Sequence, residues 1–405
     1  MLPPSAVPWK TSAIGSLGVL LSLAWVLALQ PPVMVSLLIM LAACAFPMWF
    51  LEYRRHCAAP HTMVPTHPPC PRRRRLRMAG GFVVILLLEI SIQIQLQLGG
   101  SAVDGLHALH FPLVFITASW ATLQAFLPHQ KAARLDSVAR LALAAWNLIA
   151  TGTLRRTHRQ CVLAWCVKAF FLPLMLTWLY AWLSLLLQGP QFSQGWMSAF
   201  MAAMAALYAL DTLFGTVGYL STHRSLGANI RSTDSTALGW ASALVCYPPL
   251  SALVLRQWLD YSDSIEWTHW LGHSWATVAW GLSILLLTGI YTLATVVFGP
   301  RFSNLTHRGI ITSGPFRLTK HPAYISKNLS WWLIAVPFVS DQSPTTAALN
   351  CAALLGVNSI YWLRAKTEER HLMNDPVYQQ YAAWINENGL IAKCRRAARS
   401  RAPVG

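Results

Sequence analysis

The stretch GPFRLTKHPAYISKNLSWWL, residues 314–333, joins a polar turn to the start of an apolar helix. It begins with a Gly-Pro turn and surrounds a His-Pro pair with three cations, Arg317, Lys320 and Lys327. Proline is tolerated at the first position of a helix, because its missing N–H would have no partner there. The N–H groups after Pro322 point back at the loop, and such a helix start binds carboxylates and phosphates. The stretch therefore predicts a ligand site where a helix enters the membrane.

The composition indicates a membrane protein. Apolar residues make up 55% of the 405 residues and charged residues 11%, whereas soluble proteins carry about 25% charged residues. The mean hydropathy is +0.43. A net charge of +17 is compatible with nucleic-acid binding, but the cations stand in short clusters between long apolar runs. Cytoplasmic loops of membrane proteins collect Lys and Arg in this way, so we expect a bilayer partner and no nucleic acid.

The cysteines and the N-terminus point to no further chemistry. Eight cysteines are scattered along the chain, several of them inside apolar runs, and no pair has convincing metal-site spacing. Cys161 and Cys166 are close in sequence, but small apolar packing residues are the favoured interpretation. The N-terminus lacks a basic n-region and a small-residue cleavage site. We therefore expect no metal site, and we interpret the first apolar run as a retained membrane span.

Long apolar runs predict an all-α, polytopic transmembrane helix bundle. Crossing a hydrocarbon core of roughly 30 Å requires about 20 apolar residues. Runs of this kind lie near 12–30, 31–51, 78–98, 107–127, 161–188, 197–220, 237–256, 272–298, 322–340 and 345–363. The first two are expected to form a tight hairpin through Gln30-Pro31-Pro32. The expected fold thus has about ten spans, and the last two form a C-terminal helical hairpin.

The loops set the expected orientation. The basic, proline-rich stretch 52–77 favours the cytoplasm under the positive-inside rule. The other loops on that side are then cationic as well, whereas the opposite loops carry mainly acidic residues, namely Asp104, Asp260, Asp263, Glu266 and Asp341. We therefore expect both termini in the cytoplasm. The prediction is a multi-pass protein of a bacterial inner membrane whose active site faces the cytoplasm.

Two features do not follow the simple pattern of spans. The segment 137–160 has only about 14 strongly apolar residues and is flanked by cations, which favours an interfacial or re-entrant helix. Charged residues inside spans are functional candidates by default, and three stand out: Glu89, Lys168 and Asp211. Mutual pairing, or snorkelling for Lys168, is an equally favoured interpretation. Asp211 is the one that we expect to line a substrate cavity.

We divide the chain into four parts. Residues 1–77 form an N-terminal membrane hairpin with a basic cytoplasmic linker, and 78–271 form a membrane bundle on the substrate side. Residues 272–395 form the expected catalytic region, and 396–405 are a basic tail. The stretch 228–250 has a character of its own; a substrate-side lid is one interpretation, and it stays unassigned.

A second polar constellation follows the last apolar run. The stretch YWLRAKTEERHLMNDPVYQQYAAWI, residues 361–385, places Arg364 and Glu368 four residues apart on one helix face, beside Glu369. A surface ion pair is the plain interpretation. The alternative is a site for a ligand with both an ammonium and a carboxylate, such as an amino acid moiety. Nearby aromatic residues could enclose a purine or lie in the interfacial belt, and the belt is favoured for the tryptophans.

These two constellations together resemble a known enzyme family. GPFRLTKHPAYISKNL, followed some forty residues later by RAKTEERHLMNDPVYQQYAAW, resembles the isoprenylcysteine carboxyl methyltransferase family and the related phospholipid methyltransferases. The match covers about residues 290–385. It implies S-adenosylmethionine as cofactor, in a cytoplasmic cofactor pocket at the C-terminal helical hairpin. The chain departs from the family pattern at Lys320, where arginine is usual, and at the stretch INENGLIAKC, which replaces a Val-Pro ending.

The resemblance and the residues together give a predicted site. Arg364 and Glu369 are the expected catalytic residues. Cofactor contacts are expected from Lys320, His321, Pro322, Ala323, Tyr324, Tyr361, Glu368 and Glu369. Substrate contacts are expected from Asp211, Asn328 and Trp332. This site requires that the stretch around His321 and the stretch around Glu369 fold into one pocket.

The expected function is an integral membrane S-adenosylmethionine-dependent methyltransferase. Its acceptor would be a lipid or lipid-linked molecule with a carboxylate, amine or thiol. One alternative is an NADPH-dependent membrane reductase acting on sterols or enones, although the Tyr-Gly-x-x-Trp segment usual in those proteins is absent. Another is a transporter or scaffold that uses Glu89, Lys168 and Asp211 at the midplane. The oligomeric state is left open.

Overall fold

The computed structural model describes residues 1–57, 66–67, 70–126, 129–130, 135–188, 195–261, 266–272 and 274–401. Most of this chain is helical. The longer helices are α1 (Trp9–Leu29), α2 (Val33–Cys57), α3 (Pro71–Leu98), α4 (Gly105–Phe126), α5 (Ser137–Thr151), α6 (Arg156–Leu187), α7 (Trp196–Leu220), α11 (Trp275–Val296), α12 (Pro322–Ala335), α13 (Pro344–Leu372), α14 (Pro376–Asn388) and α15 (Leu390–Arg401). Shorter pieces are α8 (Ala237–Leu244), α9 (Arg256–Trp258), α10 (Trp267–Leu271), and the turns η1 (Gly100–Val103), η3 (Arg224–Leu226), η4 (Ser251–Leu255), η5 (Gly299–Arg301) and η6 (Gly314–Arg317).

Strands play a minor part in the described chain. Strands β1 (Thr66–His67) and β2 (His129–Gln130) pair antiparallel, and so do β3 (Ser232–Thr233) and β4 (Thr306–His307). The second pair joins two loops that are far apart in the sequence, with Ser232 opposite His307. The expected all-α architecture is confirmed.

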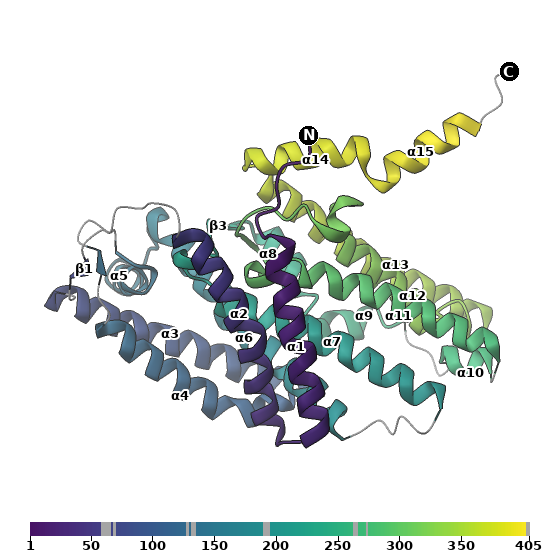
Figure 1. Cartoon of the computed structure of the whole chain (residues 1–405), viewed down its shortest axis with the longest axis horizontal. Helices are drawn as coiled ribbons and strands as arrows, with labels where there is room; N and C mark the ends of the chain where they lie inside the picture. The colour runs from purple at the N-terminus through teal and green to yellow at the C-terminus, as the bar shows by residue number, and fades with distance from the viewer. Residues whose placement is uncertain are drawn as a thin grey trace.

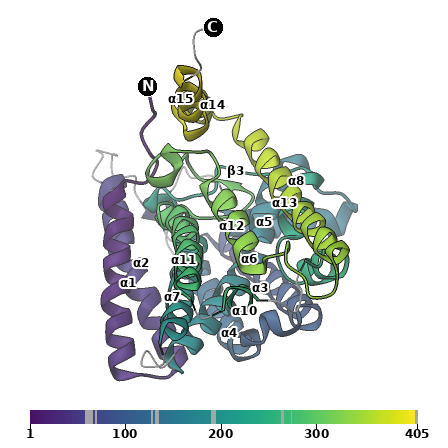
Figure 2. The same ribbon diagram turned by 90° about the vertical axis from the view of Figure 1, so that its right-hand side faces the viewer.

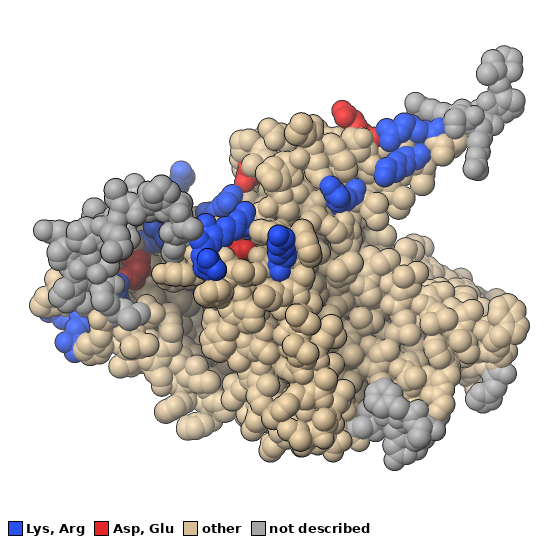
Figure 3. All heavy atoms as spheres, in the orientation of Figure 1, with Lys and Arg blue, Asp and Glu red and all other residues tan. Residues whose placement is uncertain are grey.

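Eight helices of the described chain are long and apolar enough to cross a membrane. They run over Trp9–Leu29, Val33–His56, Pro71–Leu98, Gly100–Phe126, Arg156–Leu187, Trp196–Leu220, Trp275–Val296 and Pro344–Leu372. Figure 3 agrees with this, because Lys, Arg, Asp and Glu gather toward one end of the visible face and the broad lower part of the face has almost none. A multi-pass membrane bundle is therefore supported.

Two of the ten expected spans do not appear as long helices. The expected span at 237–256 is broken, because α8 ends at Leu244 and the chain then turns through Pro248 and Pro249 into η4 and α9. Proline lacks the N–H that a continuing helix needs. The expected span at 322–340 is the 14-residue helix α12, about 21 Å long. Val336 ends it with a left-handed φ of 38° before Pro337.

The segment 137–160 also differs from its prediction. Helix α5 is a separate 15-residue helix that begins after Asp136, whose side chain accepts a hydrogen bond from the N–H of Ala139. It ends at Gly152, which has a φ of 65°. Residues from Arg156 onward belong to the long helix α6. Helix α5 is too short to span the bilayer, as expected, but the predicted segment is two elements.

The N-terminal hairpin is as expected. Helices α1 and α2 pack side by side (Figure 1), joined at Gln30, which adopts a left-handed φ of 46°. Gly18 makes the close approach possible, since a Cβ there would collide with the carbonyl oxygen of Ala43. At the other end of the hairpin, the buried carboxylate of Glu52 accepts a hydrogen bond of 2.8 Å from Thr11. This contact locks the two helices together.

The C-terminal helices α11, α12 and α13 are neighbours in the fold, and α11 also packs against α7. Figures 1 and 2 show α11, α12 and α13 side by side, with α14, α15 and the N-terminus beyond one end of the bundle. Helix α14 is held there by Asp375, which caps its first turn and lies 2.7 Å from Nε2 of His307. Burial lowers the pKa of His307, and this outweighs the opposite effect of Asp375.

The loop between α11 and α12 is held by Arg308. Its buried guanidinium donates five hydrogen bonds of 2.6–3.0 Å to four backbone carbonyls, those of Gly218, Ala228, Pro300 and Phe302. These carbonyls come from the end of α7, the following loop and the residues around η5. Every N–H donor of this buried guanidinium has an acceptor, as buried polar groups require. Since the acceptors belong to three segments, Arg308 joins those segments. The loop that precedes the site therefore has a fixed course.

Replacing Gly218 by alanine should destabilise the protein. A Cβ at Gly218 would collide with the carbonyl oxygen of Phe302, and overpacking of this kind costs about 1–3 kcal/mol. We expect a lower thermal unfolding temperature in lipid nanodiscs. Gly289→Ala in α11 is the matched control, because a Cβ added at Gly289 would have no atom within 4 Å beyond its chain neighbours and the backbone of its own helix. Equal unfolding temperatures for both variants would contradict the close approach.

Replacing His307 by glutamine should remove one source of acid sensitivity. Burial keeps the pKa of His307 below its ordinary value in the folded state. The unfolded chain therefore gains more protons as the pH falls, and the stabilisation present above the ordinary pKa is lost below it. The unfolding-temperature difference between wild type and His307→Gln should shrink from about pH 7.5 to about pH 5.5. His269→Gln, at an exposed histidine, serves as control. If the unfolding-temperature difference between wild type and His307→Gln widened as the pH fell, the lowered pKa of His307 would be refuted.

Candidate functional site

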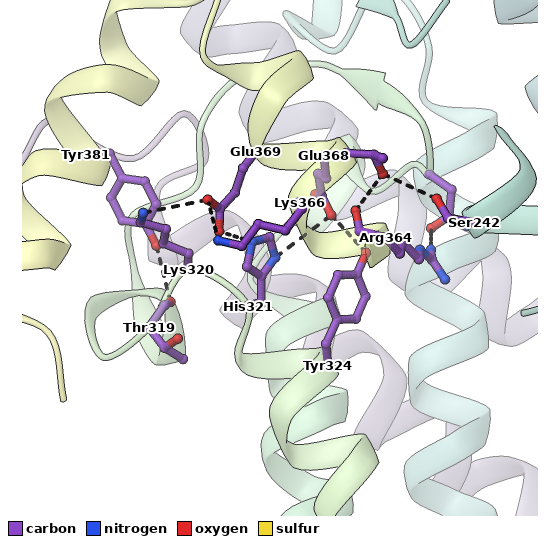
Figure 4. Close-up of polar contacts among 12 residues, drawn as sticks. Ser242, Thr319, Lys320, His321, Tyr324, Arg364, Lys366, Glu368, Glu369 and Tyr381 are labelled. Carbon is purple, nitrogen blue, oxygen red and sulfur yellow. Dashed lines mark hydrogen bonds and ion pairs between the residues drawn. The ribbon is translucent and has the colours of Figure 1, made fainter. Parts of the chain in front are cut away.

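The start of α12 and the end of α13 meet in space (Figure 4). The hydroxyl of Tyr324 donates a hydrogen bond of 2.8 Å to Glu368, and Nε2 of His321 lies 3.1 Å from Oε1 of Glu369. The rings of His321 and Tyr324 are stacked, with centroids 5.4 Å apart and an interplanar angle of 8°. The two sequence stretches that the predicted site required to meet are therefore in direct contact.

A cavity lies beside this contact. It contains about 690 Å³ of space free of atoms, open solvent included. Helices α11, α12 and α13 and the loop around Asn304 form its walls. Most of the residues predicted to bind the cofactor line it, namely Lys320, His321, Pro322, Ala323, Tyr324, Tyr361 and Glu368, together with Arg364.

Arg364 is the best-fixed charge in the cavity wall. It is only 7% exposed, and its Nη2 donates hydrogen bonds of 2.7 Å to Asn304 and 3.4 Å to the hydroxyl of Tyr247. The guanidinium carbon also lies 5.3 Å from the ring centroid of Tyr247 and 5.1 Å from that of Tyr324. Cation–π contacts of this kind stabilise a partly desolvated guanidinium. Arg364 therefore presents a fixed positive charge to the cavity.

Asn304 transmits the position of α7 to Arg364. The hydroxyl of Tyr219, on α7, accepts hydrogen bonds of 3.0 Å from both the backbone N–H and the side-chain amide of Asn304. The amide oxygen of Asn304 then accepts from Arg364. Neither Asn304 nor Tyr219 was among the predicted site residues. An isolated Asn and Tyr carry no motif, and only the fold brings them together.

Glu369 lies beside the cavity and does not line it. Besides His321, its carboxylate has Lys366 at 3.3 Å and Lys320 at 3.9 Å. Three cationic or titratable side chains thus surround one carboxylate. In this arrangement Glu369 fixes the α12 start, and Glu368, which lines the cavity, is the carboxylate available to a ligand.

Lys327 is a cavity residue that the prediction did not include. Its Nζ lies among three rings, 5.2 Å from Tyr291, 5.1 Å from Trp331 and 5.7 Å from Tyr361. It makes no ion pair within 4.0 Å with any residue that the structure describes. Lys327 and Tyr291 both line the cavity. The sequence signal that could have identified Lys327 is a lysine placed four residues before a Trp-Trp pair.

The predicted substrate residues lie outside the cavity wall. Asp211, on α7, accepts a hydrogen bond of 2.7 Å from Tyr291, which does line the cavity. Asn328 and Trp332 both bond to Asn358 of α13, at 3.3 Å and 2.8 Å. These two residues join α12 to α13. Asp211 thus contacts a residue of the cavity wall but does not line the cavity itself.

The other polar residues inside spans do not pair with one another. Glu89 contacts Nε2 of His110 at 2.8 Å and also accepts from Gln93. The ammonium of Lys168 lies 4.3 Å from the ring of Trp165. The interpretation as mutual pairing of Glu89, Lys168 and Asp211 is therefore wrong, since each has a different partner.

A second, smaller cavity adjoins the first. It has about 440 Å³ of space free of atoms, open solvent included, and shares Ser303, Asn304, Tyr324, Arg364 and Glu368 with its neighbour. Its remaining wall includes Asp234, Gly239 and Ala243, while Tyr247 lines the larger cavity. The unassigned stretch 228–250 thus contributes to both cavities. This part of the site follows from the fold and was not assigned from the sequence.

The arrangement suits a ligand that carries both signs of charge. Lys320, His321, Lys327 and Arg364 line the larger cavity together with the carboxylate of Glu368. Aromatic side chains fill much of the remaining wall. Among the residues that the structure describes there is no cluster of three His, Cys, Asp or Glu side chains that could hold a metal ion.

Three comparisons with known proteins, against family models, curated proteins and solved structures, find no significant match to this chain. The resemblance to membrane methyltransferases therefore rests on the motif residues themselves.

Replacing Tyr219 by phenylalanine should loosen the support of Arg364. The change removes the acceptor of the Asn304 N–H, and an unsatisfied buried donor costs about 1–3 kcal/mol. We expect a lower unfolding temperature in nanodiscs. Tyr180→Phe is the control, because the Tyr180 hydroxyl has no hydrogen bond within the described residues. An unchanged unfolding temperature for Tyr219→Phe would show that this link carries no stability.

Proposed function

We propose that the chain is an integral membrane methyltransferase that uses S-adenosylmethionine and acts on a lipid or lipid-linked acceptor. The observation that carries the proposal is the contact of Tyr324 and His321 with Glu368 and Glu369 beside a cavity that also holds Arg364. The motif resemblance predicts this combination for a cofactor pocket. The same proposal places the cavity, and both termini, on the cytoplasmic side of a bacterial inner membrane.

The residues fit the cofactor's chemistry. Its ammonium requires a carboxylate, and Glu368 lines the cavity with its position fixed by Tyr324. Its carboxylate requires donors, which the start of α12 and the neighbouring Lys320 and His321 supply. Its adenine requires flat apolar surfaces, and Tyr361 and Phe316 provide rings in the same wall. When bound, the group would supply a methyl on a sulfonium, which is already activated for transfer.

The protein's contribution would then be alignment. Holding two reactants in line can supply about 7–11 kcal/mol of the barrier. Arg364, fixed by Asn304, orients a carboxylate acceptor, which needs no general base. An amine or thiol acceptor must lose a proton, and His321 in its neutral form or a glutamate of the pair accepts it. The acceptor would reach the cavity from the bilayer and the cofactor from the aqueous side.

Titration of the purified protein with S-adenosylhomocysteine tests the proposal. Glu368→Gln should weaken binding about 10- to 100-fold, because hydrogen bonds to charged groups contribute about 1.5–3 kcal/mol. Glu387→Gln, an exposed carboxylate on α14, should bind like wild type. Absence of binding to the wild-type protein, or equal affinity in both variants, would refute the proposal.

A thermal-shift comparison separates the proposal from the reductase alternative. We expect S-adenosylhomocysteine to raise the unfolding temperature through preferential binding to the folded state, and NADPH to leave it unchanged. The reverse result would favour the reductase. Lipid mass spectrometry of a deletion strain would then identify the acceptor, as a species lighter by one or more methyl units.

A further inference from the structure

The C-terminal helix α15 has an apolar face that nothing in the described chain covers. Its sequence is LIAKCRRAARSR. At helical spacing, Leu390, Ile391, Cys394 and Ala398 fall on one side. Leu390 is 51% exposed and Ile391 is 64% exposed, and Cys394 and Ala398 are exposed as well. An apolar strip on an isolated helix requires a partner.

The rest of α15 is cationic. Lys393, Arg395 and Arg396 lie on it, and the helix has no acidic residue. Their directions lie to the sides of the apolar strip or opposite to it. A helix with one apolar face and Lys or Arg on the remainder is typical of segments that lie in the headgroup region of anionic membranes.

The position of α15 fits a membrane surface. It lies beyond the end of the bundle and crosses the direction of α1 at a large angle in Figure 1, and Figure 2 shows it nearly end-on in the same place. If α1 spans the bilayer, α15 lies roughly parallel to the bilayer surface. Figure 3 shows its cations on the arm that projects from the body, at the end where the other cations gather.

Hydrogen bonds attach the start of α15 and the preceding helix α14 to residues around η6. The N–H of Leu390 donates a hydrogen bond of 2.8 Å to the carbonyl of Leu318, just after η6. On α14, the hydroxyl of Tyr381 donates 2.7 Å to the carbonyl of Phe316, a residue that lines the larger cavity. The base of α15 is thus attached to the turn that leads into the candidate site.

We propose that α15 docks on the surface of the bilayer that contains the protein, with its apolar face among anionic lipid headgroups and its cations paired with their phosphates. A second copy of the chain is a poorer occupant, because α15–α15 contact would bring two sets of like charges together. A nucleic acid would pair with the cations but would leave Leu390 and Ile391 uncovered. This inference does not depend on the proposed enzymatic activity.

Cys394 provides a probe in the centre of the apolar face. Cys70→Ser removes the other exposed cysteine of the described residues, and Cys394 is then labelled with an environment-sensitive fluorophore. The full-length protein is placed, one copy per disc, in nanodiscs of phosphatidylcholine alone or with phosphatidylglycerol. A labelled Cys394→Ser variant gives the background from the remaining cysteines. The matched control carries Cys394→Ser with Arg396→Cys, which moves the label to the opposite side of the helix.

We expect the label at Cys394 to shift to the blue and to be shielded from acrylamide only in discs with phosphatidylglycerol. The label at position 396 should stay accessible. Raising the salt from about 0.15 M to about 1 M, which shortens the screening length from about 8 Å to about 3 Å, should reverse the shielding. Equal shielding in both lipids, or at both positions, would overturn the proposal.

Charge reversal gives the second test. Lys393→Glu with Arg395→Glu should weaken docking by at least about 25-fold, since each cation near an anionic surface contributes about fivefold. Lys393→Arg with Arg395→Lys keeps the charge and should dock like wild type. Both variants should keep the wild-type unfolding temperature, because these side chains are exposed. Shielding that persists after charge reversal would refute binding to an anionic surface, and shielding that appears only in discs with two copies would overturn the proposal in favour of self-association.

Discussion

The candidate site depends on the contacts that two carboxylates at the end of α13 make with residues at the start of α12. Glu368 and Glu369 lie 44 and 48 residues from their partners Tyr324 and His321. Carboxylates near a membrane boundary are costly unless hydrogen-bonded or paired. The tyrosine hydroxyl, the imidazole and the nearby lysines meet that requirement, and in doing so they hold two helices together. The cavity lies beside this contact and is lined by residues of both helices.

A second set of contacts gives the cavity its fixed charge. Arg308 holds the loop before the site through four carbonyls. Tyr219 of α7 fixes Asn304 in that loop, and Asn304 in turn fixes Arg364 of α13. These contacts run from the buried helix α7 outward to the site. The guanidinium of Arg364 is therefore positioned by a well-packed part of the bundle. A preorganised cation of this kind suits a reaction that needs alignment of two ligands.

The sequence predicted long apolar helices well, because about 20 apolar residues in a row have few other stable arrangements. It failed at 237–256 and 322–340, where prolines and helix ends interrupt an apolar run and neighbouring helices cover the shorter pieces. Most of the residues predicted for the site in α12 and α13 line the cavity, since their spacing is local. Asn304, Tyr247 and Lys327 line it as well but were not predicted. Asn328 and Trp332 were assigned to substrate but join two helices.

The sequence by itself determined that the chain is a helical membrane protein, and that two polar stretches flank its last helices. Composition and apolar run length decide this, because the bilayer excludes unpaired backbone and charge. Only the tertiary structure decided which carboxylate faces the cavity, what holds Arg364, and which face of α15 is left uncovered. Those outcomes depend on contacts between residues far apart in the chain, and local sequence carries no information about such distances.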